Sequence, residues 1–282
     1  MKDVKGKMLI IGGHEDKGDY ETLSEEDLLR KNAFAAEGVL KRFLTTLNQE
    51  QPQIEVITTA SLIPEEVGEM YQDAFKKLGV ERVGIMHIKD QAGANDPEML
   101  QRFRSAHGIL LSGGDQSRLV SIFSGSKALR IMQERYRDEE DFLIAGTSAG
   151  AMCMSQVMIT GNRDETSPLL KGTVFTGTGL GLLNQVIIDT HFMVRRRFFR
   201  LAEAVAAFPD YIGVGLDEDS AILISANKTI ETIGSGLVVI LDGRKLTKNN
   251  FAEVIHGDQL NLHHIILHIL PKGEKFEVAA KL

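Results

Sequence analysis

Short apolar runs and amphipathic segments alternate along the first half of the chain, and this alternation limits the folds that the chain can adopt. Each apolar run has the length of a buried strand and ends near a glycine or a turn residue. Such alternation favours a parallel sheet with helices on both faces. The runs are KMLIIGG (7–13), IEVITT (54–59), RVGIMHI (82–88), GILLSGGD (108–115) and FLIAG (142–146). We therefore predict a doubly wound, mainly parallel α/β fold, whose ligands bind beyond the carboxyl ends of the strands.

Helix signals lie between these runs. Ser24 and Asp27 form a capping-box pattern, which predicts one long amphipathic helix reaching about Leu47. Pro64 predicts the start of a helix that ends near Leu78, and another helix follows Pro97. The polar and apolar pattern of residues 126–140 predicts a further helix before the last strand of this half.

The C-terminal part has a different pattern, with short apolar runs joined by tight turns. The runs cover residues 185–189, 212–217, 220–225, 229–234, 236–242 and 263–270. We expect them to be mixed or antiparallel additions to the same sheet. The chain has no repeat, low-complexity stretch or long linker, so we predict a single α/β domain over residues 1–282.

Charge and cysteine content exclude several classes of function. The net charge of −7 provides no basic field for nucleic acid or an anionic membrane, so neither is expected as a partner. Cys153 is the only cysteine, which rules out an internal disulfide and a cluster of thiol ligands for a metal. No window approaches the ~18 apolar residues of a membrane span, and the first apolar run is too short for a signal peptide. We predict a cytoplasmic protein.

A serine lies between glycines at the end of the fifth apolar run. Gly146-Thr147-Ser148-Ala149-Gly150 fits G-x-S-x-G, the pattern of a nucleophile held on a sharp strand-to-helix turn. An ordinary turn that contains serine is the alternative. For a nucleophile, the N–H of Ala149 would face an oxyanion, and Gly113 or Gly114 at a neighbouring strand end could supply a second donor.

A serine nucleophile needs a base, and His191 has the most suggestive context of the eight histidines. It directly follows the run 185–189, and Asp189, two residues earlier, would point to the same side of a strand. Asp217, Glu218 and Asp219 follow another run, and one of them could orient the histidine. A lone histidine beside an acid can equally be structural.

Four arginines follow His191 within a short segment of an acidic chain: Arg195, Arg196, Arg197 and Arg200. If the segment is helical, Arg197 and Arg200 share a face. A solvated basic face is one interpretation. The use of arginine throughout favours the other, bidentate binding of carboxylates on a substrate.

These segments together resemble the cyanophycinases, which belong to the serine-peptidase family that also contains the α-aspartyl dipeptidases. The resemblance covers most of the chain and rests on LIIGGHEDK, LLSGGDQ, GTSAGA, DTHFMVRRRFFR and GVGLDEDSA, in this order. It implies a fold similar to the class I glutaminase domains. It also implies that Ser148 is the nucleophile and His191 the base, with Glu218 chosen as the acid. From the turn and the neighbouring strand end, we expect Ala149 and Gly114 to be the oxyanion donors.

The resemblance further implies a substrate and the residues that hold it. The substrate is cyanophycin, a poly-aspartate chain with arginine joined to each β-carboxyl, from which β-Asp-Arg dipeptides are released. No metal or cofactor is needed, and the family suggests a homodimer. Thr190 stands where the family often has glutamine, and His14 where a small residue is usual. The implied substrate-binding residues are Gln116, Asp189, Thr190, Arg195, Arg197 and Arg200.

Three other functions are compatible with parts of this pattern. An α-aspartyl dipeptidase would use the same chemistry, although a dipeptide pocket would not need three arginines. A non-catalytic binding protein could use the same fold. A nucleotide-binding domain is suggested by MLIIGGHEDKG, but this segment lacks the third glycine of G-x-G-x-x-G.

Overall fold

The N-terminal half forms the parallel part of a large sheet. The computed structural model describes residues 4–20, 24–163, 168–225 and 229–277. The strands of this part are parallel and lie in the order β1-β5-β4-β2-β3. They are β1 (Lys7–Ile11), β2 (Ile54–Ile57), β3 (Val83–Met86), β4 (Gly108–Leu111) and β5 (Leu143–Thr147). The predicted α/β fold with a mainly parallel central sheet is confirmed.

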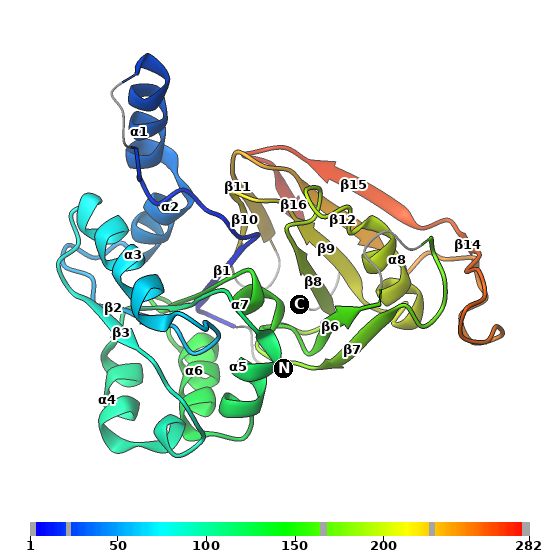
Figure 1. Cartoon of the computed structure of the whole chain (residues 1–282), viewed down its shortest axis with the longest axis horizontal. Helices are drawn as coiled ribbons and strands as arrows, with labels where there is room; N and C mark the ends of the chain where they lie inside the picture. Colours follow the sequence, from blue (N-terminus) through cyan, green and yellow to red (C-terminus); the bar gives the residue numbers. More distant parts are fainter. Residues whose placement is uncertain (1–3, 21–23, 164–167, 226–228, 278–282) are drawn as a thin grey trace.

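Helices cover both faces of this sheet (Figure 1). Phe43 of α2 and Phe75 of α3 pack in one buried cluster, and Phe103 of α4 and Phe123 of α5 pack in the cluster on the opposite face. The helices of this half are α1 (Glu25–Glu37), α2 (Val39–Leu47), α3 (Pro64–Lys77), α4 (Pro97–Ser105), α5 (Gln116–Phe123) and α6 (Lys127–Asp138), with a 3-10 turn at Gly93–Asn95. Burial of both faces explains why the strands read as continuous apolar runs.

Two details of the predicted helices differ in the structure. The long helix expected from Ser24 is broken at Gly38, whose ψ of 160° is extended and ends the i→i−4 hydrogen bonding of α1. Figure 1 shows α1 projecting from the body of the molecule, which explains its exposed Leu28 and Leu29. The sequence prediction also missed α5, which begins where the Asp115 side chain accepts the N–H of Ser117 at 2.8 Å.

The C-terminal strands divide between two sheets, so the expectation that all of them extend the first sheet is wrong. One group continues the large sheet in antiparallel order beyond β1: β10 (Ser220–Ser225), β11 (Thr229–Gly234) and β16 (Lys275–Glu277). The other group forms a separate four-stranded sheet in the order β15-β12-β9-β8. Its strands are β8 (Val186–Thr190), β9 (Ile212–Leu216), β12 (Val238–Asp242) and β15 (Ile266–Leu270).

The remaining elements join or cover the two sheets. They are α7 (Ala149–Met152), α8 (Phe198–Ala207), the hairpin of β6 (Val157–Asn162) and β7 (Val174–Thr178), and the short pair β13 (Lys248–Asn249) and β14 (Leu262–His263). A single hydrophobic cluster includes Ile10 and Ile222 of the large sheet and Ile188 and Ile240 of the small one. This shared core fixes the position of one sheet relative to the other.

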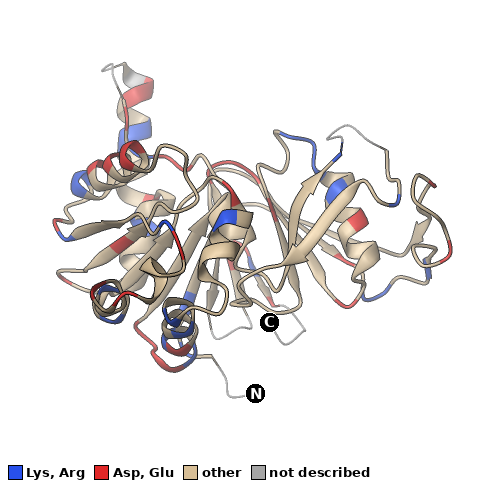
Figure 2. Ribbon diagram, turned by 60° about the horizontal axis from the view of Figure 1, so that its bottom comes forward, with Lys and Arg blue, Asp and Glu red and all other residues tan. Residues whose placement is uncertain are grey.

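Charged residues of both signs are distributed over the helices and loops (Figure 2). The electrostatic potential at a given site therefore depends on the charged residues that line it more than on the net charge of the chain. Within the described part of the chain, no helix combines the length and apolar character needed to cross a membrane.

Candidate active site

Ser148 occupies a sharp turn between β5 and α7. Its φ of 51° and ψ of −116° are strained for a residue with a side chain. The turn requires the glycines on either side, because a Cβ at Gly146 would lie 2.4 Å from the carbonyl oxygen of Gly150. A Cβ at Gly150 would lie 2.1 Å from the carbonyl oxygen of Leu111 in β4. The G-x-S-x-G segment therefore forms the strained elbow that exposes a serine above a sheet.

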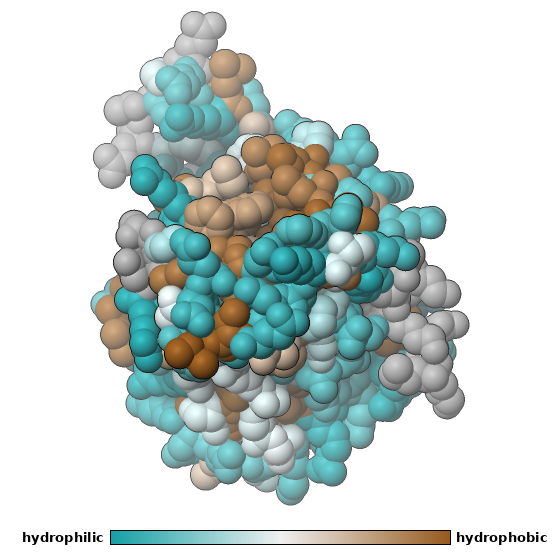
Figure 3. Space-filling view, turned by 90° about the vertical axis from the view of Figure 1, so that its right-hand side faces the viewer, coloured by the Kyte–Doolittle hydropathy of each residue, from teal (hydrophilic) through white to brown (hydrophobic). Residues whose placement is uncertain are grey.

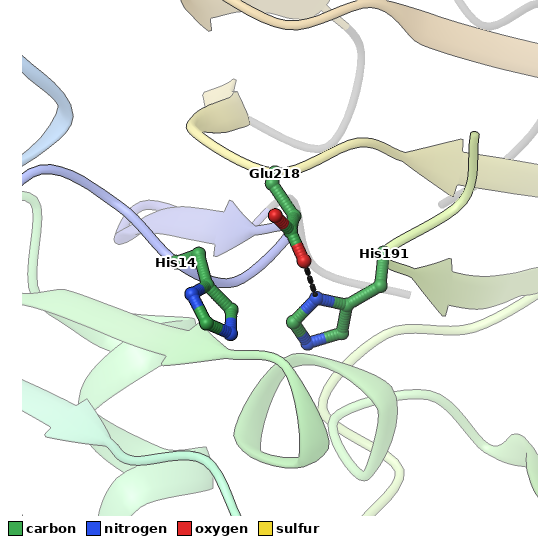
Figure 4. A group of neighbouring side chains, drawn as sticks. All are labelled: His14, His191 and Glu218. Atoms are coloured by element: carbon green, nitrogen blue, oxygen red, sulfur yellow. Dashed lines mark hydrogen bonds and ion pairs between the residues drawn. The ribbon is translucent and has the colours of Figure 1, made fainter. Parts of the chain in front are cut away.

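Ser148, His191 and Glu218 form a hydrogen-bonded chain. Ser148 Oγ lies 2.9 Å from His191 Nε2, and His191 Nδ1 lies 2.7 Å from Glu218 Oε1. This is the arrangement of a nucleophile, a base and an acid that orients the base. Figure 4 shows the Glu218 carboxylate directed at the His191 ring.

The topology explains how residues far apart in the sequence meet here. His191 directly follows β8, and its N–H donates to the carbonyl oxygen of Gly12 at the end of β1. Glu218 precedes β10, which starts beside the end of β1 because the two strands are antiparallel. Gly13 permits the close approach, since a Cβ there would lie 2.5 Å from His191 Cε1.

Only one of the three candidate acids contacts the histidine. Asp217 Oδ1 accepts the N–H groups of Met193 and Val194. Asp219 accepts the N–H of Asp16 and the hydroxyl of Ser235. Those two carboxylates hold loops, whereas Glu218 bonds to His191. The hydrogen bond to His191 thus distinguishes Glu218 from its two neighbours, through a geometry that the sequence does not contain.

The pKa of His191 is lowered from its ordinary value of 6.5. Burial of the ring is the main cause, and the nearby charges of Arg195 and His14 act in the same direction. The hydrogen bond and charge of Glu218 oppose this shift. At neutral pH His191 is therefore unprotonated and able to accept a proton from Ser148.

This shift predicts the acid limb of the pH profile. A base must be unprotonated, so kcat/KM should rise with pH through a pKa below 6.5 and reach its plateau before neutral pH. The Arg195→Gln variant should move this limb to higher pH, because it removes a cation that lowers the pKa of His191. Initial rates of peptide hydrolysis from pH 4 to 9 provide the measurement. A wild-type limb centred above 6.5 would contradict the assignment.

A cavity of about 470 Å³ opens beside Ser148 and His191. Its lining includes two cationic side chains, Lys17 and Arg195, together with Gly113 and Gly114. A Cβ at Gly113 would lie 3.4 Å from Ser148 Cβ, so the backbone at this strand end directly adjoins Ser148. Ala149 begins α7, and the first N–H groups of a helix have no partner within the helix.

Glu15 forms a buried network beside this cavity that sequence reasoning missed. Its carboxylate accepts hydrogen bonds from Tyr71 of α3 and from the hydroxyl of Thr147 at 2.7 Å, and Lys17 lies 3.1 Å away. Burial raises the pKa of Glu15, but Lys17 and these hydrogen bonds outweigh it, so the pKa is lowered and the group stays charged. Through Thr147, the network holds the residue that precedes Ser148. In the sequence, the network is indicated only by Glu15 and Lys17 just after the first strand, and no pattern indicates that Tyr71 takes part.

Most of the expected substrate-binding residues lie away from the cavity. Arg200 forms a bidentate ion pair with Asp189, and Arg197 Nη1 donates to the carbonyl oxygen of Thr190 at 2.8 Å. Asp189 and Thr190 are fully buried, and the two arginines nearly so. None of these four residues is among those that line the cavity, and the guanidinium groups of the two arginines pair with an interior carboxylate.

Two further expected contacts have different positions. Gln116 Nε2 donates to the carbonyl oxygens of Ile159 and Thr160 and so links α5 to β6. Arg195 is exposed and lines the cavity beside His191. Of the three arginines expected to bind carboxylates, Arg195 is the one that lines the cavity together with Ser148.

The Asp189→Asn variant should lower the free energy of unfolding by about 3 kcal/mol or more, because it leaves two buried guanidinium groups without their carboxylate. Urea unfolding followed by circular dichroism measures the change. The exposed Arg195→Gln variant is the control and should unfold almost as the wild type does. Unchanged stability of Asp189→Asn together with a raised KM would instead place Asp189 at the substrate.

Comparison with known proteins identifies the family of the chain. Residues 30–232 match Peptidase family S51. The chain is 34% identical over 275 residues to a cyanophycinase of Trichormus variabilis, covering 98% of this chain and 86% of the relative. It is also 34% identical over 274 residues to a cyanophycinase of Synechococcus elongatus, covering 97% and 80% of the two chains.

Solved structures share the fold at lower identity. A peptidase from an acI-B1 Actinobacterium aligns over 99% of both chains with a TM-score of 0.63 and 18% identity. A putative peptidase E protein of Listeria monocytogenes aligns over 81% of this chain and 98% of its own, with a TM-score of 0.54 and 16% identity. The chain therefore belongs to peptidase family S51 and is a serine-type peptidase.

Proposed function

We propose that this peptidase hydrolyses cyanophycin from the chain end and releases β-Asp-Arg dipeptides through an acyl-enzyme on Ser148. The observation that carries the proposal is the Ser148–His191–Glu218 chain at a cavity lined by Lys17 and Arg195. Relatives over nearly the whole chain are cyanophycinases, which supports the choice of substrate. The proposed reaction uses side chains, backbone N–H groups and water.

The geometry suggests a role for each group in the reaction. His191 Nε2 accepts the proton as Ser148 Oγ attacks the peptide carbonyl between two aspartates, and Glu218 stabilises the imidazolium that forms. N–H groups at Ala149 and Gly114 hold the oxyanion, and one such donor is commonly worth ~3 kcal/mol of transition-state stabilisation. His191 then protonates the leaving amine, and a water activated by His191 releases the acyl group.

The charge of the cavity fits one part of the substrate. Each repeat of cyanophycin carries a free carboxylate, and Lys17 and Arg195 are cations on the lining of the cavity. Arg195 is the stronger candidate for this contact, since Lys17 already pairs with Glu15. Arg195→Gln should therefore raise KM more than it lowers kcat.

An α-aspartyl dipeptidase is the second candidate function. The inward position of Arg197 and Arg200 favours it, because three arginines beside the base were the argument for a polymer. A cavity with one exposed arginine can also accept a small acidic peptide. The same triad would perform the chemistry in both cases.

The deciding experiment compares the two substrates. Purified insoluble cyanophycin and a set of α-Asp dipeptides are incubated separately with the wild type and the Ser148→Ala variant, and the products are followed by mass. Release of Asp-Arg from the polymer by the wild type alone supports the proposal. Turnover of α-Asp dipeptides without release from the polymer would replace it with the dipeptidase.

We also infer a cytoplasmic homodimer. An exposed apolar strand supports the dimer: β15 is an edge strand whose Ile266, Leu267 and Ile269 are exposed. Figure 3 views the molecule from the side of β14 and β15 and shows apolar surface gathered on the upper part of this end. Sedimentation velocity should give a species of twice 31.1 kDa, which Leu267→Asp should convert to the monomer. A monomeric wild type at all concentrations would contradict the dimer.

A further inference from the structure

A second imidazole lies beside the catalytic base. His14 follows β1 and faces His191, with the two ring centroids 5.3 Å apart and the ring planes at 77° (Figure 4). Glu218 completes the group, and one ligand atom from each of the three side chains lies within 4.8 Å of the other two. His14 also has a φ of 48°, a left-handed backbone conformation that is uncommon for a residue with a side chain. This backbone, set directly after Gly13, directs the ring toward the triad.

Two imidazoles and one carboxylate are a donor set typical of zinc in proteins. A tetrahedral zinc ion with bonds of ~2.0–2.1 Å needs its donors about 3.3 Å apart. His14 is exposed, so rotation of its side chain can shorten the present separation without disturbing the core. The cavity beside the triad leaves room for water as a fourth ligand.

We propose that His14, His191 and Glu218 bind Zn²⁺ and that the bound ion reversibly blocks catalysis. Both nitrogens of His191 already serve the triad, Nε2 toward Ser148 and Nδ1 toward Glu218. An ion that takes Nε2 displaces Ser148, and an ion that takes Nδ1 replaces the hydrogen bond between Nδ1 and Glu218. Zinc binding and activation of Ser148 therefore exclude each other.

The charges around the site set the conditions for binding. Imidazole binds a metal only when it is neutral. Glu218 supplies the compensating negative charge. Arg195 and Lys17 line the same cavity and oppose a dication, so we expect binding weaker than at a structural zinc site.

The test measures binding of Zn²⁺ without any substrate. Isothermal titration with Zn²⁺ and the visible absorption of Co²⁺, whose intensity reports a tetrahedral site, are recorded on the Ser148→Ala protein. The same background then receives His14→Ala or, as the matched control, His263→Ala, which removes an exposed histidine of β14. His14→Ala should weaken Zn²⁺ binding by about tenfold or more, and His263→Ala should leave it unchanged.

A second measurement joins binding to catalysis. Zn²⁺ should inhibit the protein with Ser148 intact, a chelator should restore the rate, and His14→Ala should need about tenfold more Zn²⁺ for the same fractional inhibition. Equal binding by His14→Ala and its parent, or an equal loss in His263→Ala, would overturn the site. The titration measures Zn²⁺ binding without any turnover. Its result therefore does not depend on which substrate the enzyme cleaves, and it remains interpretable if cyanophycin is not the substrate.

Discussion

Replacing Ser148 with alanine is expected to reduce peptide hydrolysis by about 10⁴-fold or more, the scale seen when the nucleophile of a serine hydrolase is removed. Ser148 is the hydroxyl in hydrogen-bond contact with His191 at the strained elbow, and alanine provides no atom to form the acyl-enzyme. The residues next to Ser148 are small and the serine side chain is short, so we expect the alanine variant to fold as the wild type does. Steady-state rates on the accepted substrate, with circular dichroism to verify folding, provide the measurement.

Ser117→Ala is the matched control for this variant. Ser117 is exposed on α5, so its loss should change the rate by less than about twofold. Turnover of Ser148→Ala at the wild-type rate would move the nucleophile to another residue.

Glu218→Gln is expected to lower kcat by about 10³- to 10⁴-fold, as for the amide replacement of a triad acid. The amide no longer stabilises the imidazolium, and its NH₂ group can favour the wrong tautomer of His191. The charge of Glu218 raises the pKa of His191, so the acid limb of the remaining activity should move to lower pH. Rates measured across the pH range on one preparation give both the loss of kcat and the shift of the acid limb.

Asp219→Asn separates this effect from a general change in the loop. Asp219 is the next residue, and its carboxylate accepts hydrogen bonds from Asp16 and Ser235 without contacting His191. We expect this variant to keep its rate within about tenfold of the wild type. A larger loss in Asp219→Asn than in Glu218→Gln would give the role of the acid to Asp219.

Local patterns in the sequence were sufficient to predict the parallel sheet and the sharp turn at Ser148. The five apolar runs of the first half correspond to β1 to β5, because strands buried on both faces need continuous apolar side chains. The elbow was visible because its glycines are required within a few residues of the serine. The C-terminal strands were visible as strands, but their division between two sheets depends on pairing between distant segments.

The orientation of charged side chains was not predictable in the same way. A run of arginines looks the same whether it faces solvent, substrate or a buried acid, and here Asp189 draws Arg197 and Arg200 into the interior. Glu15 and Tyr71 are 56 residues apart, so their hydrogen bond leaves no local pattern. The choice of Glu218 among three adjacent acids depends on a turn that directs one carboxylate at His191.

The most direct test of the central claim, that His191 and Glu218 activate Ser148, is the intact mass of the protein after treatment with a serine-directed fluorophosphonate. We predict one adduct on the wild type, mapped to Ser148 by peptide mass, no adduct on Ser148→Ala, and slower labelling of Glu218→Gln. An unlabelled wild type, or labelling at the same rate in Ser148→Ala, would contradict the account.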